Sequence, residues 1–186
     1  SYSGAGQPIE LLRRSPWMIL GNKKLFSMSK ENPYVGDHTP TLDLGDKGMG
    51  GIYQERLAVV KGKKYSGRVI LSSSGNATVS VRLVWGSGAT QFAVKTFEKL
   101  SNEFEKYYFD FTADKTTDNA RIEIIASGSG TVKIGTLSLM PSDNIYGFRA
   151  DTMALLKELN SPVYRWPGGN FVSGYNWRDG IGDPDR

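Results

Sequence analysis

The sequence predicts a mainly β protein, in which a jelly-roll or β-sandwich domain is followed by a helix and a strand of a second architecture. Between about residues 25 and 140, apolar and polar residues alternate in many short runs that end in glycine, serine or asparagine. After Met140 and Pro141 the apolar spacing changes from two to roughly helical. Many short strands with turn signals between them favour a sandwich or jelly roll over a parallel sheet.

The alternation of apolar residues is the basis for each predicted strand. Val79, Val81, Leu83 and Trp85 would share one face of a strand, because successive side chains point to opposite sides of a sheet. The same spacing predicts further strands around Tyr65, Gly67, Val69 and Leu71; Phe109 and Phe111; Ile122 and Ile124; and Val132, Ile134, Leu137 and Leu139. Within the last of these runs, Gly135 indicates a β-bulge.

Helical signals flank the predicted sandwich on both sides. Residues 1–24 form a glycine-rich lead in which residues 9–14 are predicted to be a short helix before Pro16. On the other side, Ser142 or Asp143 is predicted to cap a helix that Asn160, Ser161 and Pro162 end. The apolar residues of that helix would be Ile145, Phe148, Met153, Leu155, Leu156 and Leu159. A strand over residues 163–166 is expected to follow.

Composition excludes several classes of protein. The 186 residues are 39% hydrophobic and 23% charged, which is typical of a soluble globular chain, and no run approaches the roughly 20 apolar residues of a membrane helix. The net charge of +4 comes without a basic stripe interleaved with aromatics, so we expect neither nucleic acid nor membrane as a partner. Without cysteine there are no disulfides or thiolate metal sites. We expect no cofactor and no metal.

The residues most suggestive of chemistry follow the predicted strand over residues 163–166. Arg165 and Asn170 supply hydrogen-bond donors, and between them Gly168 and Gly169 allow tight turning and close approach of a ligand. Tyr175 and Trp177 supply flat walls with polar edges. This set of side chains suits a sugar ring that lies beside a carboxylate.

At these residues the chain resembles the family 51 glycoside hydrolases, which are chiefly α-L-arabinofuranosidases. The resemblance rests on three motifs: residues 147–151 (GFRAD), 162–170 (PVYRWPGGN) and 174–182 (GYNWRDGIG). The region before them looks like the carbohydrate-binding-module-type sandwich that some members insert early in their (β/α)8 barrel. The resemblance divides the chain into a lead at 1–24 that includes a possible first barrel helix (residues 9–17), a sandwich at 25–140, and an incomplete barrel segment at 141–186.

The resemblance implies a retaining glycosidase, in which one carboxylic acid protonates the leaving oxygen and a second carboxylate attacks the anomeric carbon. In the family both are glutamates of later barrel strands, and the acid/base lies in an Asn-Glu-Pro motif that this chain lacks. We therefore expect both catalytic groups outside this chain, and we expect these 186 residues alone to hydrolyse no arabinoside. Arg165 resembles the arginine that bonds the nucleophile, and Asn170 the asparagine that bonds a furanose hydroxyl.

Other polar and aromatic residues have plainer interpretations. Asp179, Asp183 and Asp185 lie in a Gly/Pro-rich loop and are expected to be turn-forming and solvated rather than an acid/base pair. His38, the one histidine of the sequence, makes no case for a metal site. Of four sandwich aromatics that suit a sugar platform, Trp85 is expected in the core, whereas Tyr53, Phe92 and Tyr107 stay open.

Three functions remain open at this stage. The chain is the N-terminal part of an arabinofuranosidase acting on hemicellulose or pectin, a carbohydrate-binding module, or a spacer that shapes the barrel entrance. The expected partners are an arabinose-containing oligo- or polysaccharide and the remainder of the same enzyme, which a trypsin-like cut at Arg186 would leave as a separate chain. The sequence does not fix the compartment, although an appended sandwich leans towards a secreted or periplasmic enzyme.

Overall fold

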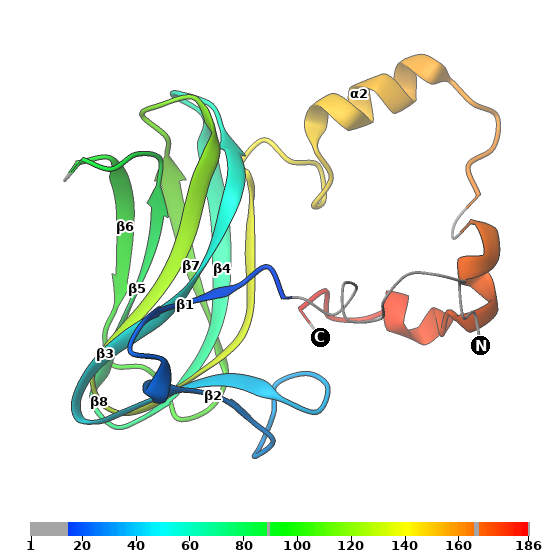
Figure 1. The fold of residues 1–186 in the computed structure, drawn as a ribbon. Coiled ribbons are helices and arrows are strands. Elements are labelled where there is room, and N and C mark those ends of the chain that lie inside the picture. The colour runs from blue at the N-terminus through cyan, green and yellow to red at the C-terminus, as the bar shows by residue number, and fades with distance from the viewer. Residues whose placement is uncertain (1–14, 89, 166–167, 186) are drawn as a thin grey trace, which may run out of the picture.

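The computed structural model describes residues 15–88, 90–165 and 168–185, so the helix expected over residues 9–14 lies outside the described residues. Within them the chain forms a β-sandwich followed by a largely helical segment (Figure 1). The strands are β1 (Met18–Gly21), β2 (Phe26–Ser29), β3 (Thr39–Val59), β4 (Lys64–Ser74), β5 (Ala77–Val84), β6 (Phe92–Phe97), β7 (Glu105–Thr112) and β8 (Thr117–Pro141). The helices of the described residues are η1 (Lys23–Leu25), α2 (Ala150–Leu159), η2 (Gly169–Gly174) and η3 (Trp177–Gly180); α2 is an α-helix and the other three are 3₁₀ helices.

Two long strands, β3 and β8, take part in both layers of the sandwich. β8 pairs with β5 through residues 121–128 and with β4 through residues 131–141. β3 pairs with β1 through residues 50–53 and with β2 through residues 39–42. The β5 sheet therefore has the antiparallel order β1–β3–β8–β5–β6, and the β4 sheet has the order β2–β3–β8–β4–β7.

Glycines mark the point where the shared strands bend from one sheet to the other. Gly45 of β3 (φ +58°) pairs with Gly130 of β8 (φ +89°), and the register between the strands shifts on both sides of this pair. Positive φ is the region that glycine adopts with little strain. At Gly128, a Cβ atom would also collide with the carbonyl oxygen of Asn76. A bend at this place thus requires residues without side chains.

Inward-facing residues of both sheets form one hydrophobic core. Val69 and Leu71 of β4, Val81 of β5 and Ile124 of β8 are completely buried, as the alternation of the sequence predicts. Trp85 joins this core, as expected, with 7% of its surface exposed. The three aromatics left open divide: Tyr107 packs against the core, whereas Tyr53 and Phe92 belong to the outer face of the β5 sheet.

The bulge expected at Gly135 is present. Val69 pairs with Leu137 and Leu71 with Ile134, so that Ile70 of β4 faces both Gly135 and Thr136 of β8. A Cβ atom at Gly135 would lie 2.8 Å from the ring of Tyr34, which covers this part of the β4 sheet and packs against Phe104 with ring centroids 5.0 Å apart. The glycine therefore makes room for an aromatic cover on the outer face.

Gly67 of β4 offers a test of this packing, because the ring of Phe109 from β7 lies directly over it. A methyl group there would overlap that ring and lie 2.7 Å from the carbonyl oxygen of Ser138. We predict that Gly67→Ala lowers the free energy of unfolding by about 1–3 kcal/mol through overpacking. Lys64→Ala, at the exposed start of the same strand, should change it by less than about 0.5 kcal/mol. Urea denaturation of both variants measures this, and equal midpoints would contradict it.

Candidate active-site segment

The chain leaves the sandwich through a tight turn rather than through the helix start expected at Ser142 or Asp143. That prediction is wrong: the Ser142 side chain hydrogen-bonds Ser66 (Oγ–Oγ 2.6 Å), and Asp143 pairs with Lys63 (Nζ–Oδ2 3.3 Å). Ile145 and Phe148 then exchange backbone hydrogen bonds of 2.8 and 2.9 Å.

The turn is held by Asn144, whose side-chain amide donates to the Pro141 carbonyl oxygen and accepts from the Gly147 N–H. Its two central residues, Tyr146 (φ +51°) and Gly147 (φ +88°), have left-handed backbone. This conformation cannot continue into a helix, so α2 begins only at Ala150.

α2 ends where the sequence predicts, at Asn160, which has left-handed backbone (φ +46°, ψ +41°). None of its residues is buried, and Leu155 and Leu159 have 66% and 68% of their surface exposed. At its start, Arg149 bonds both carboxylate oxygens of Asp151, which with the Thr152 N–H lowers the pKa of Asp151 to about 2. The helix therefore presents its apolar side chains to solvent within this chain.

The strand expected over residues 163–166 does not form in its described part. Residues 161–165 have no regular structure, and Val163 and Tyr164 have 75% and 57% of their surface exposed. A strand requires a neighbour to accept and donate its backbone hydrogen bonds. No strand of the described chain pairs with this stretch. Arg165 is accordingly exposed. Trp166 lies outside the described residues.

The predicted sugar-binding residues follow one another along an exposed segment and are not gathered into a pocket. Gly169 has φ +65° and needs to be glycine for that reason, whereas Gly168 is extended (φ −112°). Asn170 is exposed within η2. The half-buried Tyr175 places its hydroxyl against Gly180, and Trp177, with 63% of its surface exposed, lies beside the Arg178 guanidinium at 5.5 Å.

The end of this segment returns to the sandwich, and here the expectation of solvated aspartates is wrong for Asp185. Only 6% of Asp185 is exposed. Arg68 of β4 donates from Nε to both of its carboxylate oxygens, at 2.9 and 2.8 Å, and Lys106 of β7 lies 2.9 Å away. Asp183 does form a turn, because its side chain accepts from the Asp185 N–H at 3.0 Å, and it also pairs with Lys106.

The charges around Asp185 determine its ionisation. The hydrogen bond from Arg68 lowers the pKa of Asp185 more than burial raises it, and Lys106 lowers it further. The pKa of Asp183 is lowered by the backbone N–H of Asp185 and by Lys106. Both carboxylates are therefore ionised at neutral pH. Sequence reasoning missed the contact because no local pattern links Arg68 to a residue 117 positions away.

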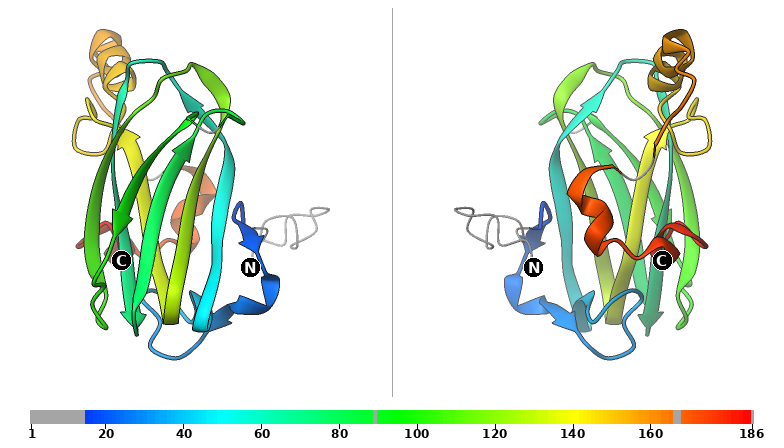
Figure 2. Two further views of the ribbon diagram at one scale, coloured as in Figure 1. Left: turned by 90° about the vertical axis from the view of Figure 1, so that its left-hand side faces the viewer. Right: turned by 90° about the vertical axis from the view of Figure 1, so that its right-hand side faces the viewer.

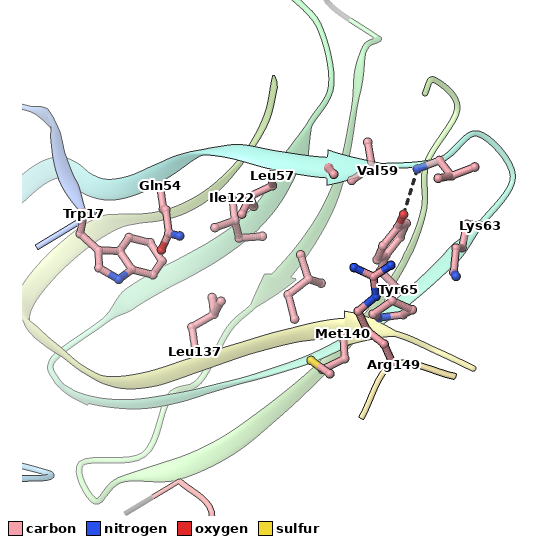
Figure 3. A pocket seen from close by; sticks show the side chains of 14 residues that line it. Trp17, Gln54, Leu57, Val59, Lys63, Tyr65, Ile122, Leu137, Met140 and Arg149 are labelled. Carbon is pink, nitrogen blue, oxygen red and sulfur yellow. Dashed lines mark hydrogen bonds between the residues drawn. The ribbon is translucent and has the colours of Figure 1, made fainter. Parts of the chain in front are cut away.

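A cleft of about 570 Å³ opens between the end of β3 and the end of β8 (Figure 3). Its lining is largely apolar, with Trp17 at one end, Leu57 and Leu137 between, and the cations Lys63 and Arg149 at the other end. Tyr65 accepts a hydrogen bond from the Val60 N–H at 2.9 Å. Because its lining includes no carboxylate, this cleft does not suit acid/base chemistry.

Within the described ranges no three His, Asp or Glu side chains are grouped as a metal site, and His38 is exposed. In the same ranges no helix has the length and apolar character to cross a membrane.

The ion pair predicts how Asp185 titrates. Because Arg68 depresses its pKa, the Asp185 carboxyl should titrate below the ordinary value of about 3.9. The stabilisation is present above about pH 4 and is lost as the pH falls through the lowered pKa. Arg68→Ala should raise this midpoint, because burial raises the pKa of Asp185 and the opposing effect of Arg68 is then lost. Arg82→Ala, on the other sheet, should not. A ¹³C carboxyl NMR titration distinguishes these outcomes, and an unchanged midpoint in Arg68→Ala would contradict the assignment.

Comparison of sequences finds short but close similarities. No model of a known protein family matches the chain. A stretch of 36 residues is 64% identical to intracellular exo-α-(1→5)-L-arabinofuranosidase 1 of Bacillus subtilis and covers 19% of this chain and 7% of that enzyme. A stretch of 46 residues is 52% identical to the probable α-L-arabinofuranosidase C of Aspergillus terreus and covers 25% and 9%. The similarity thus spans less than a tenth of these relatives' lengths.

Comparison of structures covers far more of the chain. A family 51 α-L-arabinofuranosidase with bound arabinose matches 91% of this chain and 31% of its own, with a TM-score of 0.69 and 16% identity. A family 61 carbohydrate-binding module in complex with β-1,4-galactotriose matches 69% of this chain and 90% of its own, with a TM-score of 0.53 and 16% identity. The chain is therefore related by short sequence matches to α-L-arabinofuranosidases, shares its fold with a family 51 member over nine-tenths of its length, and contains a sandwich with the fold of carbohydrate-binding modules.

Proposed function

We propose that this chain is the N-terminal part of a retaining α-L-arabinofuranosidase that releases terminal arabinofuranosyl groups from hemicellulose or pectin. The observation that carries the proposal is the 64% identity over 36 residues to an exo-arabinofuranosidase. The order of a sandwich and then a helical segment, which resembles a family 51 enzyme, supports it. In this proposal residues 141–186 begin the catalytic barrel. The sandwich begins before the expected boundary at residue 25, since β1 (Met18–Gly21) pairs with β3.

The chemistry needs two carboxylates about 5 Å apart, one as nucleophile and one as acid/base. In the proposal both come from the rest of the protein, and this chain prepares their site. Arg165 keeps the nucleophile ionised, as a cation beside a carboxylate lowers its pKa. Its exposure here fits a side chain whose partner belongs to another barrel strand. Asn170 bonds a furanose hydroxyl, Gly168 and Gly169 let the sugar approach, and Tyr175 and Trp177 form walls.

Arg165→Ala in the complete enzyme tests this role. Loss of the cation raises the pKa of the nucleophile, so the acidic limb of the pH profile of kcat/KM should move up by about 1–3 units. At pH 5 the hydrolysis of nitrophenyl α-L-arabinofuranoside should fall by about tenfold or more. Lys157→Ala, on exposed α2, serves as the control and should leave the profile unchanged. An Arg165→Ala enzyme with the parental profile would refute the role, and a complete protein without turnover would refute the function.

Binding of a polysaccharide by the sandwich is the second candidate function, and the outer face of the β5 sheet favours it. Across this face Tyr53, Glu123 and Arg82 lie opposite one another on β3, β8 and β5. Glu123 is 2% exposed, with Arg121 Nε at 2.6 Å and Arg82 Nη1 at 3.5 Å, and the Arg82 guanidinium stacks 4.0 Å over Phe92. No described segment crosses this face in Figure 2 (left). Aromatic and charged side chains in a fixed row suit a sugar chain.

Affinity electrophoresis in gels with arabinoxylan or arabinan tests this candidate. Tyr53→Ala and Phe92→Ala should migrate faster than the parent protein in polysaccharide gels, because stacking surface is lost, while hydrolysis of the small nitrophenyl substrate stays unchanged. Tyr108→Ala removes an exposed tyrosine of the opposite sheet and should migrate like the parent. A parent protein that the polysaccharides do not retard would exclude this candidate and leave the sandwich as a spacer.

A further inference from the structure

The segment that follows β8 is attached to the sandwich near its end by a buried aspartate. Among the described residues after Pro141 whose burial is defined, Asp185 is the one that is buried. Between Asn160 and Asp185 the described residues form short 3₁₀ helices and irregular stretches, and most of the side chains whose burial is defined are exposed. The contact of Asp185 with the sandwich is therefore the buried attachment of this stretch among the described residues. Figure 2 (right) shows its last part against the β4 sheet.

The contact is a network of two cations and two carboxylates. Besides its two Nε contacts, Arg68 approaches Asp185 Oδ1 with Nη2 at 2.7 Å, so the guanidinium holds the carboxylate with two nitrogens. Lys106 Nζ lies 2.9 Å from Asp185 and 3.0 Å from Asp183, so this ammonium group bridges the two carboxylates. Paired donors on a planar guanidinium fix orientation as well as distance.

The sheet presents these cations together because of its register. Lys106 pairs with Ile70 and Tyr108 with Arg68 across β7 and β4. Residues two apart on a strand share a face, so Arg68 and Lys106 are diagonal neighbours on the outer face of the β4 sheet. They line, with Ser66, Tyr108 and Pro184, a cleft of about 630 Å³ between the sandwich and the returning segment. Asp183 and Asp185, at the end of the returning segment, therefore meet two cations whose positions are fixed by the strands of the β4 sheet.

We propose that Arg68 and Lys106 are positioning residues for the candidate active-site segment: through Asp183 and Asp185 the sandwich holds residues 168–184 in place. The inference rests on the proposed function, since it assigns the sandwich a part in shaping the arabinofuranose site. Asn170, Tyr175 and Trp177 lie between α2 and this contact, and a sugar site needs such groups held in a fixed geometry. Loss of the attachment frees the stretch without removing any group that touches substrate.

Hydrogen exchange of the complete protein tests the attachment without any sugar. Asp185→Ala and Arg68→Ala should each raise the exchange rate of peptides covering residues 168–184 by at least threefold. Arg68→Lys should restore part of the protection, because an ammonium keeps the charge but not the paired donors. Lys64→Ala is the matched control, because it removes an exposed cation at the start of the strand that carries Arg68. Parental exchange in Asp185→Ala, which leaves every strand of the sandwich intact, overturns the proposal.

Kinetics then separate positioning from general stability. Each single variant should raise KM for an arabinofuranoside about threefold to tenfold, with the pH profile of kcat unchanged, because the carboxylates that react are untouched. The double variant Arg68→Ala/Asp185→Ala should be no worse than either single variant, since both remove one interaction. Additive losses, or equal losses in Lys64→Ala, overturn the proposal. A parent protein inactive on arabinofuranosides defeats the proposed function, whereas the exchange result stands independently of it.

Discussion

The structure depends on one constraint, which is that β3 and β8 must bend sharply enough to serve two sheets. Gly45 and Gly130 face each other at the bend with positive φ, and Gly128 lies where a side chain would strike Asn76. With these glycines, the residues on one side of β8 continue as core on both halves, from Ile124 through Ile134. A side chain at the bend would force the two halves apart and open the core that both sheets share.

The same bend gives the sandwich two outer faces of different character. The face of the β5 sheet carries the row of Tyr53, Glu123 and Arg82 and lies open to solvent (Figure 2). The face of the β4 sheet is covered by Tyr34, which lies over Gly135, and by Asp185, which pairs with Arg68. One face is thus available to a soluble partner, and the other is occupied by the chain itself. The two proposals for the sandwich, polysaccharide binding and positioning, use different faces and do not exclude each other.

The sequence predicted correctly those features of the sandwich that the local pattern of residues determines. The alternation around Val81 and Val69, the bulge at Gly135 and the core position of Trp85 follow from side-chain period and size, and the structure confirms them. The predicted helix start at Ser142 or Asp143 was wrong. The reason is also local, because Asn144 and Gly147 form a turn that competes with a helix cap at Ser142. The strand at Val163 needs neighbouring strands that the described part of the chain does not contribute, so its apolar run alone does not fix its structure.

The candidate site shows the same division. Residue types around Arg165 and Asn170 predicted a sugar site, and the resemblance to family 51 implied the role of each. Both residues are exposed in the structure, and their predicted contacts depend on partners that no local pattern specifies. Asp185 is the clearest case, because neither its burial nor its pairing with Arg68 can be read from the loop that contains it. Contacts between residues far apart in sequence arise only when the two sheets and the returning segment are assembled.

The path of the chain into and out of the sandwich has an evolutionary consequence. Trp17, just before β1, and Met140, at the end of β8, line the same cleft (Figure 3), so entry and exit lie at one side of the module. A module with neighbouring ends can be grafted into a surface loop of a host without distorting it. Arg68 and Lys106 limit this transfer, however. A sandwich placed in a new host would keep its fold, but it would bind a neighbouring loop of that host only if the loop carried two carboxylates in the positions of Asp183 and Asp185.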